Sequence, residues 1–367
     1  MKAAERGAAT VAITLLMAFV ILLSVAFAHR SVLFEARTSI NQYRAAQASE
    51  AAEAGIDWAL AQLNSSEPTG SDCTAFRERS VSAMQATCVA NESGWACQCP
   101  GNTPSTSHRV AFSIAVAATD PPDTLQLTST GFSHSSRAQL QVRLGRLPGL
   151  DTLPAAALTV RGSVNFVSGA FDIRHTSAAS GGLTLHSGGA IEPGALRLTS
   201  TPGTPASASV LSQESTLAQL TPTGLFASLF RMSREAWRAQ PMARELDCSQ
   251  ACDASLQQAA ARHQLIWLRG GLKLDSSTVL GTPQRPLLLV ADGPVELQAG
   301  AVIHGLVYGT DPRWSDAAGA TVHGAVVIEG DFQASGSTQI QYDAAVLKAL
   351  HQHTGSYARM PGSWRDH

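Results

Sequence analysis

Residues 8–28 form an apolar run without a charged side chain, and this run constrains the chain more than any other feature. A helix rises ~1.5 Å per residue, so these 21 residues span roughly 30 Å, the thickness of the hydrocarbon core of a bilayer. The run therefore predicts one membrane-spanning helix close to the N-terminus.

The residues on either side of the run predict its orientation. Lys2 and Arg6 precede it with a single acid, Glu5, and a short, net basic leader stays in the cytoplasm. We therefore expect a single-pass protein with most residues after position 30 on the far side of the membrane. The alternative is a secretory signal peptide cut after Ala28, but the apolar run is longer than the core of such a peptide.

The overall charge and composition exclude one class of partner and favour one class of fold. The formal net charge is -2, so electrostatics give no case for nucleic-acid binding. Only 15% of the residues are charged and 30 are glycine, a composition typical of a β-rich exported protein.

The cysteines are even in number, as expected for disulfides in an exported chain. They fall into two groups: Cys73, Cys88, Cys97 and Cys99, and then Cys248 and Cys252. We expect Cys248 and Cys252 to pair locally and the other four to pair among themselves in one of three ways. The paired C-x₂-C spacing of a zinc site is absent, so we expect no metal there.

The helix continues beyond the membrane. Residues 31–63 contain no proline and are rich in good helix formers. Ala52, Ile56 and Ala59 recur at helical spacing, with acids on another face. We expect a transmembrane and stalk helix over 8–64, whose distal half packs on a folded domain.

The next two segments differ in pattern. Residues 65–107 contain the first cysteine group among Gly, Pro and Ser, and predict a loop region. Within 108–147, three segments alternate apolar and polar residues, most clearly 137–144. They predict a small three-stranded antiparallel sheet that covers the apolar stripe of the long helix.

A repeat predicts a different β architecture for residues 148–345. Residues 302–307 match 321–326 at an offset of 19, and a further step of 19 places Leu287 under Leu306 and Asp292 under Asp311. Short strand-like runs with glycine corners at this period predict stacked coils, a Gly-rich β-solenoid. A Gly-rich β-sandwich is the alternative.

Two helical segments interrupt or follow the predicted coils. Residues of about 206–265 have helical periodicity and contain Cys248 and Cys252, so we expect a helical insertion there. Residues 346–367 are expected to form a C-terminal helix and tail. The complete fold class predicted is α+β and membrane-anchored: a long N-terminal transmembrane helix, a small antiparallel sheet and a solenoid-like domain.

An enzymatic function would need carboxylates clustered on one face. The repeat region offers Asp292, Glu296, Asp311, Asp316, Glu329 and Asp331. Asp292 with Asp311, and His304 with His323, are expected to stack in register, but one like residue per coil is usually structural. No nucleophile elbow, zinc-protease motif, phosphate-binding loop or complete dinucleotide fingerprint occurs. We expect no catalytic, cofactor-binding or metal residues. Trp267, Tyr308 and Trp314 were considered as a contact surface, with packing as the alternative.

The N-terminal segment resembles the PilX-type minor pilins of type IV pili. The matching residues are Glu5-Arg6-Gly7-Ala8-Ala9, the apolar run, and Gln47-Ala-Ser-Glu-Ala-Ala-Glu-Ala-Gly55. The closing Pro361-Gly-Ser-Trp-Arg-Asp366 is also similar to the end of larger members. The resemblance covers residues 5–64 well and is looser beyond them.

This resemblance implies a function, a processing site and partners. Prepilin peptidase would cut between Gly7 and Ala8, so that residues 1–7 are a leader peptide. Ala12 would take the place of the acid usual at the fifth position after the cut. Implied partners are other minor pilins and the major pilin, the inner-membrane assembly platform and membrane lipid.

The implied location is the bacterial inner membrane, with the N-terminus cytoplasmic and the bulk periplasmic, and then the extracellular pilus. The implied role is to help initiate pilus assembly at the filament tip, with adhesion as an additional role. A minor pseudopilin of type II secretion and a membrane-tethered β-helix protein acting on carbohydrate are the alternatives.

Overall fold

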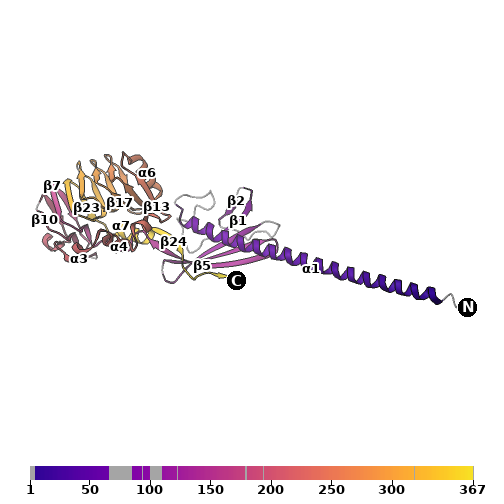
Figure 1. Cartoon of the computed structure of the whole chain (residues 1–367). Helices are drawn as coiled ribbons and strands as arrows, with labels where there is room; N and C mark the ends of the chain where they lie inside the picture. The colour runs from indigo at the N-terminus through magenta and orange to yellow at the C-terminus, as the bar shows by residue number, and fades with distance from the viewer. Residues whose placement is uncertain are drawn as a thin grey trace. The chain divides into compact units, whose positions relative to one another are not determined.

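The computed structural model describes residues 5–65, 85–92, 94–99, 110–121, 123–177, 180–192, 194–317 and 319–366. The chain divides into two compact units (Figure 1). Unit 1 comprises Met1–Ala61, Thr69–Leu144 and Arg359–His367, and unit 2 comprises Gln62–Pro68 and Gly145–Ala358.

Unit 1 is built on one helix, α1, which runs without interruption through Glu5–Leu63. Its 59 residues correspond to a length of about 88 Å. It is long and apolar enough near its N-terminus to cross a membrane. The predicted continuation of the apolar run into a stalk is therefore confirmed.

The antiparallel sheet that contains the strands of unit 1 is larger than the three strands expected from the sequence. Its order is β2-β1-β3-β4-β5-β24, with β25 beside β5. The strands are β1 (Gln85–Asn91), β2 (Gly94–Gln98), β3 (Ala111–Thr119), β4 (Thr124–Ser133), β5 (Ser136–Pro148), β24 (Gly355–Arg359) and β25 (Arg365–Asp366).

Two of our expectations are corrected by this sheet. Residues 85–98 were assigned to a loop region, but they form the antiparallel hairpin β1–β2. The C-terminal tail is not free of regular structure either, because β24 and β25 both pair with β5. In the hairpin and in the two C-terminal strands, apolar and polar residues do not alternate over enough positions for a strand to be recognised from the sequence alone.

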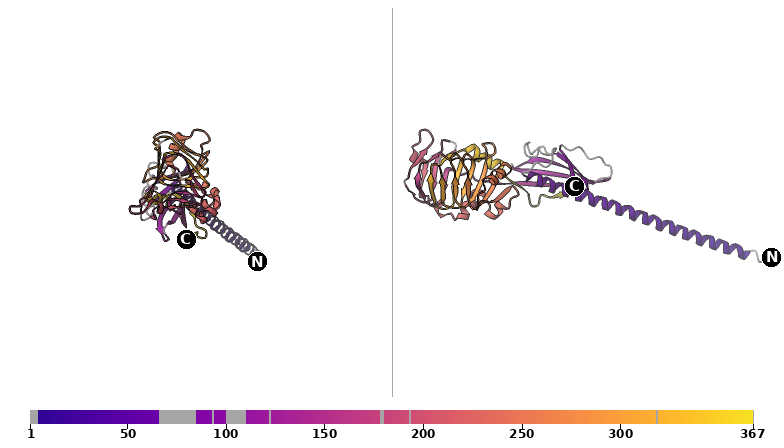
Figure 2. Two further views of the ribbon diagram at one scale, coloured as in Figure 1. Left: turned by 90° about the vertical axis from the view of Figure 1, so that its left-hand side faces the viewer. Right: turned by 90° about the horizontal axis from the view of Figure 1, so that it is seen from above.

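Unit 2 contains two sheets of parallel strands, which Figure 2 shows as successive layers of the chain. The six-stranded sheet has the order β10-β7-β22-β20-β18-β15. The path through the 12-stranded sheet is β11-β8-β23-β21-β19-β17-β14-β13, with β6, β9, β12 and β16 paired beside it.

The strands of unit 2 are short. Those before residue 215 are β6 (Ala156–Val160), β7 (Val164–Gly169), β8 (Phe171–Arg174), β9 (Leu183–Ser187), β10 (Ile191–Glu192), β11 (Leu196–Thr199) and β12 (Val210–Leu211). Those after it are β13 (Ala243–Asp247), β14 (Leu265–Arg269), β15 (Leu272–Leu274), β16 (Val279–Leu280), β17 (Leu287–Asp292), β18 (Val295–Leu297), β19 (Val302–Gly309), β20 (Arg313–Asp316), β21 (Thr321–Ile328), β22 (Phe332–Gly336) and β23 (Gln339–Tyr342).

The order of the layers does not follow the order of the chain. The last strands, β21, β22 and β23, pair with β6, β7 and β8, which are early strands of unit 2. From that junction the N-terminal strands stack in one direction, and β19, β17, β14 and β13 stack in the other. Residues more than 150 positions apart thereby become direct neighbours.

The register between β19 and β21 is the one that the repeat predicted. His304 pairs with His323, and Gly305 pairs with Gly324, at an offset of 19. One step further the prediction is wrong by one residue: Leu287 lies beside Gly305 and Leu288 beside Leu306. The pairing therefore ends with Ala291 beside Gly309, so Asp292 does not align with Asp311. The turn between these strands is one residue shorter than the repeat suggests.

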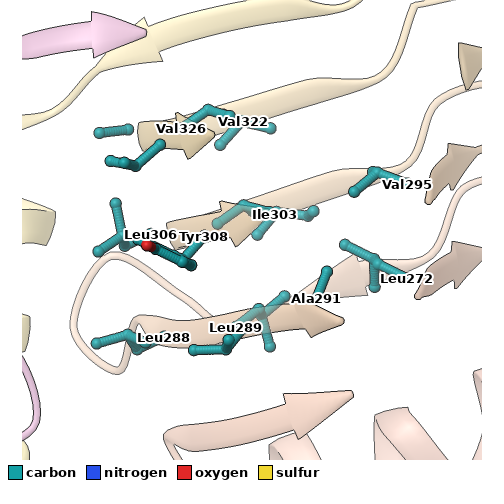
Figure 3. Close-up of a cluster of buried hydrophobic side chains, with 14 of the residues drawn as sticks. Leu272, Leu288, Leu289, Ala291, Val295, Ile303, Leu306, Tyr308, Val322 and Val326 are labelled. Carbon is teal, nitrogen blue, oxygen red and sulfur yellow. The ribbon is translucent and has the colours of Figure 1, made fainter. Parts of the chain in front are cut away.

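Both faces of the 12-stranded sheet are buried in its C-terminal half, and Figure 3 shows part of this core. Five of the six residues of β17 are buried, and the sixth, Asp292, is exposed. One face shares this core with the six-stranded sheet, from which Leu272 and Val295 point toward Ala291 and Ile303 in Figure 3. The opposite face contacts helices: Phe226 of α4 packs on Tyr308, with ring centroids 5.3 Å apart.

The helices of unit 2 are short. They are η4 (Ala206–Ser209), α3 (Ser215–Gln219), α4 (Pro222–Phe230), α5 (Arg234–Arg238), α6 (Asp253–Arg262) and α7 (Ala344–His353). The expected helical insertion over 206–265 is thus only partly helical, because β12 and β13 lie inside it and pair with strands of the 12-stranded sheet. Helix α7 begins two residues before the expected C-terminal segment, where Asp343 accepts hydrogen bonds from the amides of Ala345 and Val346.

Candidate functional site: the N-terminal helix

The two halves of α1 have opposite surroundings. From residue 10 to residue 43 all of its side chains are exposed, and they include Phe19, Leu22 and Phe27. Exposed apolar side chains also continue past the predicted membrane segment, at Val32, Phe34 and Ile40. A long apolar surface that its own chain leaves uncovered requires lipid or other helices to bury it.

Polar side chains in the apolar half are satisfied within the helix. The hydroxyl of Thr14 donates to the carbonyl of Val11 at 3.0 Å, and that of Ser24 donates to the carbonyl of Val20 at 2.8 Å. These bonds remove the cost of an unpaired hydroxyl in hydrocarbon. This part of α1 is therefore compatible with a dry environment along its length.

The distal half of α1 packs on the sheet of unit 1 through small residues. Ala48, Ala52, Ile56 and Ala59 are completely buried. Ala52, Ile56 and Ala59 are the residues whose spacing predicted this face, whereas the acids Glu50, Glu53 and Asp57 are exposed, as expected. Small side chains let the helix backbone approach the strands closely.

Two glycines define how close the approach is. A Cβ atom on Gly131 of β4 would lie 1.9 Å from the carbonyl oxygen of Ala48, which is far inside van der Waals contact. On the helix, a Cβ atom on Gly55 would lie 2.9 Å from Cδ2 of Phe112. The helix and the sheet are therefore fitted to each other backbone against backbone.

Polar contacts fix the register of this packing. Ser133 of β4 donates a hydrogen bond from its hydroxyl to Oε1 of Gln47 at 2.9 Å. Asp57 on the exposed face forms an ion pair with Arg359. Surface ion pairs of this kind contribute little energy, so the apolar fit is the main stabilising contact.

The predicted processing site lies at the start of this helix. Gly7 and Ala8 both fall within α1, whose first residue is Glu5. Ala12, the position where the acid of the resembled family is missing, lies one turn beyond and is exposed.

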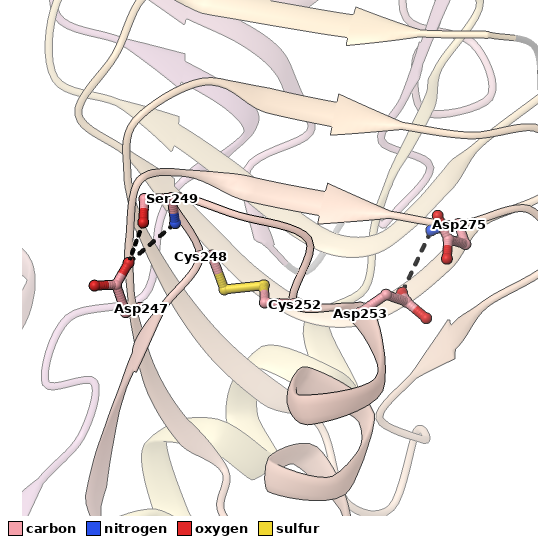
Figure 4. The surroundings of a disulfide bond; sticks show 6 residues. All are labelled: Asp247, Cys248, Ser249, Cys252, Asp253 and Asp275. Carbon is pink, nitrogen blue, oxygen red and sulfur yellow. Dashed lines mark hydrogen bonds between the residues drawn. A yellow bond between two sulfur atoms is a disulfide. The ribbon is translucent and has the colours of Figure 1, made fainter.

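The described cysteines are all disulfide-bonded. Cys88 of β1 and Cys97 of β2 occupy paired positions of the hairpin and form a disulfide. Cys248 and Cys252 form a second one, with Cα atoms 5.1 Å apart, between the end of β13 and the start of α6 (Figure 4). Cys99 is also disulfide-bonded, and Cys73 lies outside the described residues.

Two acids of the repeat region, Asp311 and Asp331, are each held by their own partner. Asp311 pairs with Arg313, which lowers the pKa of that carboxyl, and the Ser163 amide and hydroxyl lower the pKa of Asp331. Within the described residues, no group of three or more His, Cys, Asp or Glu is arranged to hold a metal ion. The acids therefore do not gather into one site.

One buried polar cluster could not be recognised from the sequence. The Tyr308 hydroxyl donates to Oε1 of Glu329 at 2.7 Å, and Arg234 of α5 pairs with the same carboxylate. Burial, together with the Glu329 charge, raises the pKa of Tyr308. Tyr308 is fully buried, and only a few per cent of the surface of Trp267 and Trp314 is exposed. These three aromatic residues are therefore part of the packed core and do not form a contact surface.

No protein-family model matches the chain, and no curated protein sequence matches it. Among solved structures, the chain is similar to the crystal structure of the competence-associated pilin ComZ from Thermus thermophilus. The two are 12% identical, the match covers 88% of this chain and 97% of that one, and the TM-score is 0.24. Because both values are low, we draw nothing about this chain from the likeness.

Proposed function

We propose that the chain is a minor pilin, a structural subunit that helps to initiate assembly of a type IV pilus and occupies the filament tip. The single observation that supports this most is the division of α1, with an uncovered apolar half and a distal half fitted to a sheet. In this proposal the free half serves first as an inner-membrane anchor. It then packs against the corresponding helices of other minor pilins and the major pilin.

Processing is part of the proposal. The basic Arg6 and the small Gly7 directly precede the apolar run, so a prepilin peptidase would release Ala8 as the mature N-terminus. The bulk of the chain would then be periplasmic before assembly and extracellular afterwards.

The absence of an acid at Ala12 supports a terminal position. A carboxylate inside hydrocarbon is costly unless it is paired, and the amine of a neighbouring subunit is a suitable partner. A subunit without this carboxylate lacks an attraction to the subunit above it. It is therefore suited to a place with nothing above.

The size of unit 2 supports the same position. It holds more than half of the chain, from Gly145 to Ala358, and we propose that its stacked parallel strands form a β-solenoid. Helices about 10 Å in diameter pack closely in a filament, so a body of this size on every subunit would obstruct its neighbours. At a tip it is unobstructed and free to contact a surface, which is how it would contribute to adhesion.

Deletion of the gene, followed by electron-microscopic counting of surface filaments, tests this function. We expect few or no filaments, restored by the wild-type gene without any need to introduce an acid by Ala12→Glu, but not by Gly7→Leu, which should leave the precursor uncut. Normal filaments together with lost protein secretion would instead identify a pseudopilin. Normal filaments and normal secretion would refute both roles.

A further inference from the structure

Three arginines follow one side of α1 between the apolar run and the part that packs on the sheet. Arg30, Arg37 and Arg44 are spaced by seven residues, which is nearly two helical turns, so they lie in one line along the helix. Leu33 and Ile40, each three residues after an arginine, are exposed beside this line. Side chains that recur at three- and four-residue spacing form the seam between two packed helices.

The described part of the chain supplies no partner for these arginines. Arg30, Arg37 and Arg44 form neither a hydrogen bond nor an ion pair with a described residue. An acid three or four residues away would pair with an arginine within the helix, but no Asp or Glu occupies such a position for any of the three. The positive charges of this line are therefore available to another molecule.

The acids of the same helix lie on the opposite side. Glu53 follows Arg44 by nine residues, which is two and a half turns. Glu50 and Asp57 lie one turn from Glu53 on its own side, so three like charges are neighbours, an arrangement that slightly destabilises an isolated helix. The helix thus has separate basic and acidic faces, a charge pattern suited to contact with other charged helices and not to an isolated rod.

Anionic lipid does not account for the whole line of arginines. Arg44 lies 14 residues beyond Arg30, a rise of about 21 Å along the helix. The headgroup layer on each side of the hydrocarbon core is only about 5–8 Å thick. Headgroups at the end of the apolar run would contact Arg30, whereas Arg37 and Arg44 would lie beyond them.

We propose that Arg30, Arg37 and Arg44, the arginine stripe, bind the acidic face of a helix from a neighbouring pilin subunit, one that presents carboxylates at seven-residue spacing. This inference rests on the proposed function, in which α1 packs beside the helices of other subunits. A seven-residue repeat favours two helices that cross at about 20°, so the partner helix lies nearly parallel to α1.

The contact combines apolar and charged pairs. Apolar side chains of the partner helix cover Leu33 and Ile40, and its carboxylates accept hydrogen bonds from the guanidinium groups on either side. These bonds are charge-assisted and become stronger once the apolar contact has excluded part of the water. The arginine stripe therefore selects which helices α1 packs against, because a basic helix in the same place would be repelled.

Quantitative mass spectrometry of filaments sheared from cells that express the full-length chain tests the stripe. Arg37→Glu should lower the amount of this chain per major pilin by about tenfold, because like charges then face each other across the seam. Arg37→Lys keeps the charge and should incorporate nearly as well as the wild type. Ser39→Glu with Gln42→Glu changes the net charge by the same amount on the side away from the stripe, and this matched control should incorporate as the wild type does.

A cross-linking experiment identifies the partner without altering the arginines. Asn41 lies on the stripe, four residues after Arg37, and is exposed. The photo-reactive residue p-benzoylphenylalanine in place of Asn41 should cross-link this chain in intact cells to a helical segment of another pilin subunit that carries acids at seven-residue spacing. Cross-links to lipid alone, or only to β-strand segments, would overturn the proposal.

The two experiments separate the stripe from the subunit role. Immunoblots of membranes should show Arg37→Glu at the wild-type level, so that its loss from filaments reports lost contact and not lost protein. Equal filament abundance of Arg37→Glu and the wild type would overturn the stripe and leave the subunit role intact. Absence of the wild-type chain itself from filaments would overturn the proposed function, and the stripe with it.

Discussion

Gly131 of β4 lies directly beneath the backbone of α1 at Ala48, so closely that a Cβ atom on Gly131 would meet the Ala48 carbonyl oxygen at 1.9 Å. The amide nitrogen of Ala52 is the next obstacle, at 2.5 Å. Both obstacles are backbone atoms, which cannot rotate away as a side chain can. The close packing of α1 on its sheet thus requires glycine at position 131, because the Cβ atom of any other residue would clash with the helix backbone.

Gly131→Ala should therefore loosen α1 from the sheet. We expect a loss of about 1–3 kcal/mol from overpacking. Hydrogen–deuterium exchange of the full-length protein in micelles should become faster in β3 and β4. Ala117→Ser on the exposed part of β3 is the control and should leave exchange unchanged. Equal exchange in both variants would mean that α1 is not held by this contact.

Gly324→Ala should destabilise unit 2. Its φ is +142°, and a Cβ atom there would lie 1.8 Å from the carbonyl oxygen of its register partner Gly305. Strain and overpacking together should cost about 3 kcal/mol. Gly330→Ala is the matched control: it has open space around it and should change stability by less than about 0.5 kcal/mol. Chemical denaturation of both variants checks the prediction. Similar denaturation midpoints for the two variants would contradict it.

Unit 2 should lose stability in mild acid. Burial lowers the pKa of His175, His186 and His304 below the ordinary value of 6.5. The unfolded chain therefore binds protons first, so stability falls as the pH drops below 6.5 and continues to fall until the folded rings titrate. The carboxyls of Asp311 and Asp331 have lowered pKa values and act only in stronger acid.

Thermal midpoints measured from pH 7.5 to 5.5 check this pH dependence. They should decrease steadily, and the decrease should be shallower in His186→Gln than in the wild type. His353→Asn, which changes an exposed histidine, should retain the wild-type slope. A midpoint that is constant over this range would contradict the lowered pKa values of these three histidines.

The disulfides should be closed in protein isolated from membranes. Mass mapping without reductant should recover Cys248 joined to Cys252 and Cys88 joined to Cys97. Closing the short Cys248–Cys252 loop should contribute about 2 kcal/mol by restricting the unfolded chain, so Cys248→Ser with Cys252→Ser should lower stability by that amount. Six free thiols, or a bond between the two cysteine groups, would contradict the structure.

The sequence predicts those parts of the fold whose signal is local. The charge-free run and the spacing of Ala52, Ile56 and Ala59 define α1, because a helical period is visible within a few turns. The register of His304 on His323 follows from a duplicated His-Gly pair. In each case neighbouring residues carry the information.

Other parts depend on contacts between distant residues. Nothing in 156–160 indicates that β6 pairs with β21, because the two segments share no repeat and lie far apart in the chain. The β1–β2 hairpin is too short to alternate clearly. The stacked histidines show the same limit: the sequence predicts that His304 and His323 stack, but the buried Nδ1 of His304, which has no partner among the described residues, depends on everything packed around it.

Quantitative mass spectrometry of sheared, purified filaments tests the central claim most directly. The account predicts that peptides of this chain are present at a small fraction of the abundance of the major pilin, and that the first one begins at Ala8. Abundance equal to that of the major pilin would contradict the tip position. Absence from the filaments, or a first residue at position 29 or later, would contradict the assembly of this chain through its N-terminal helix.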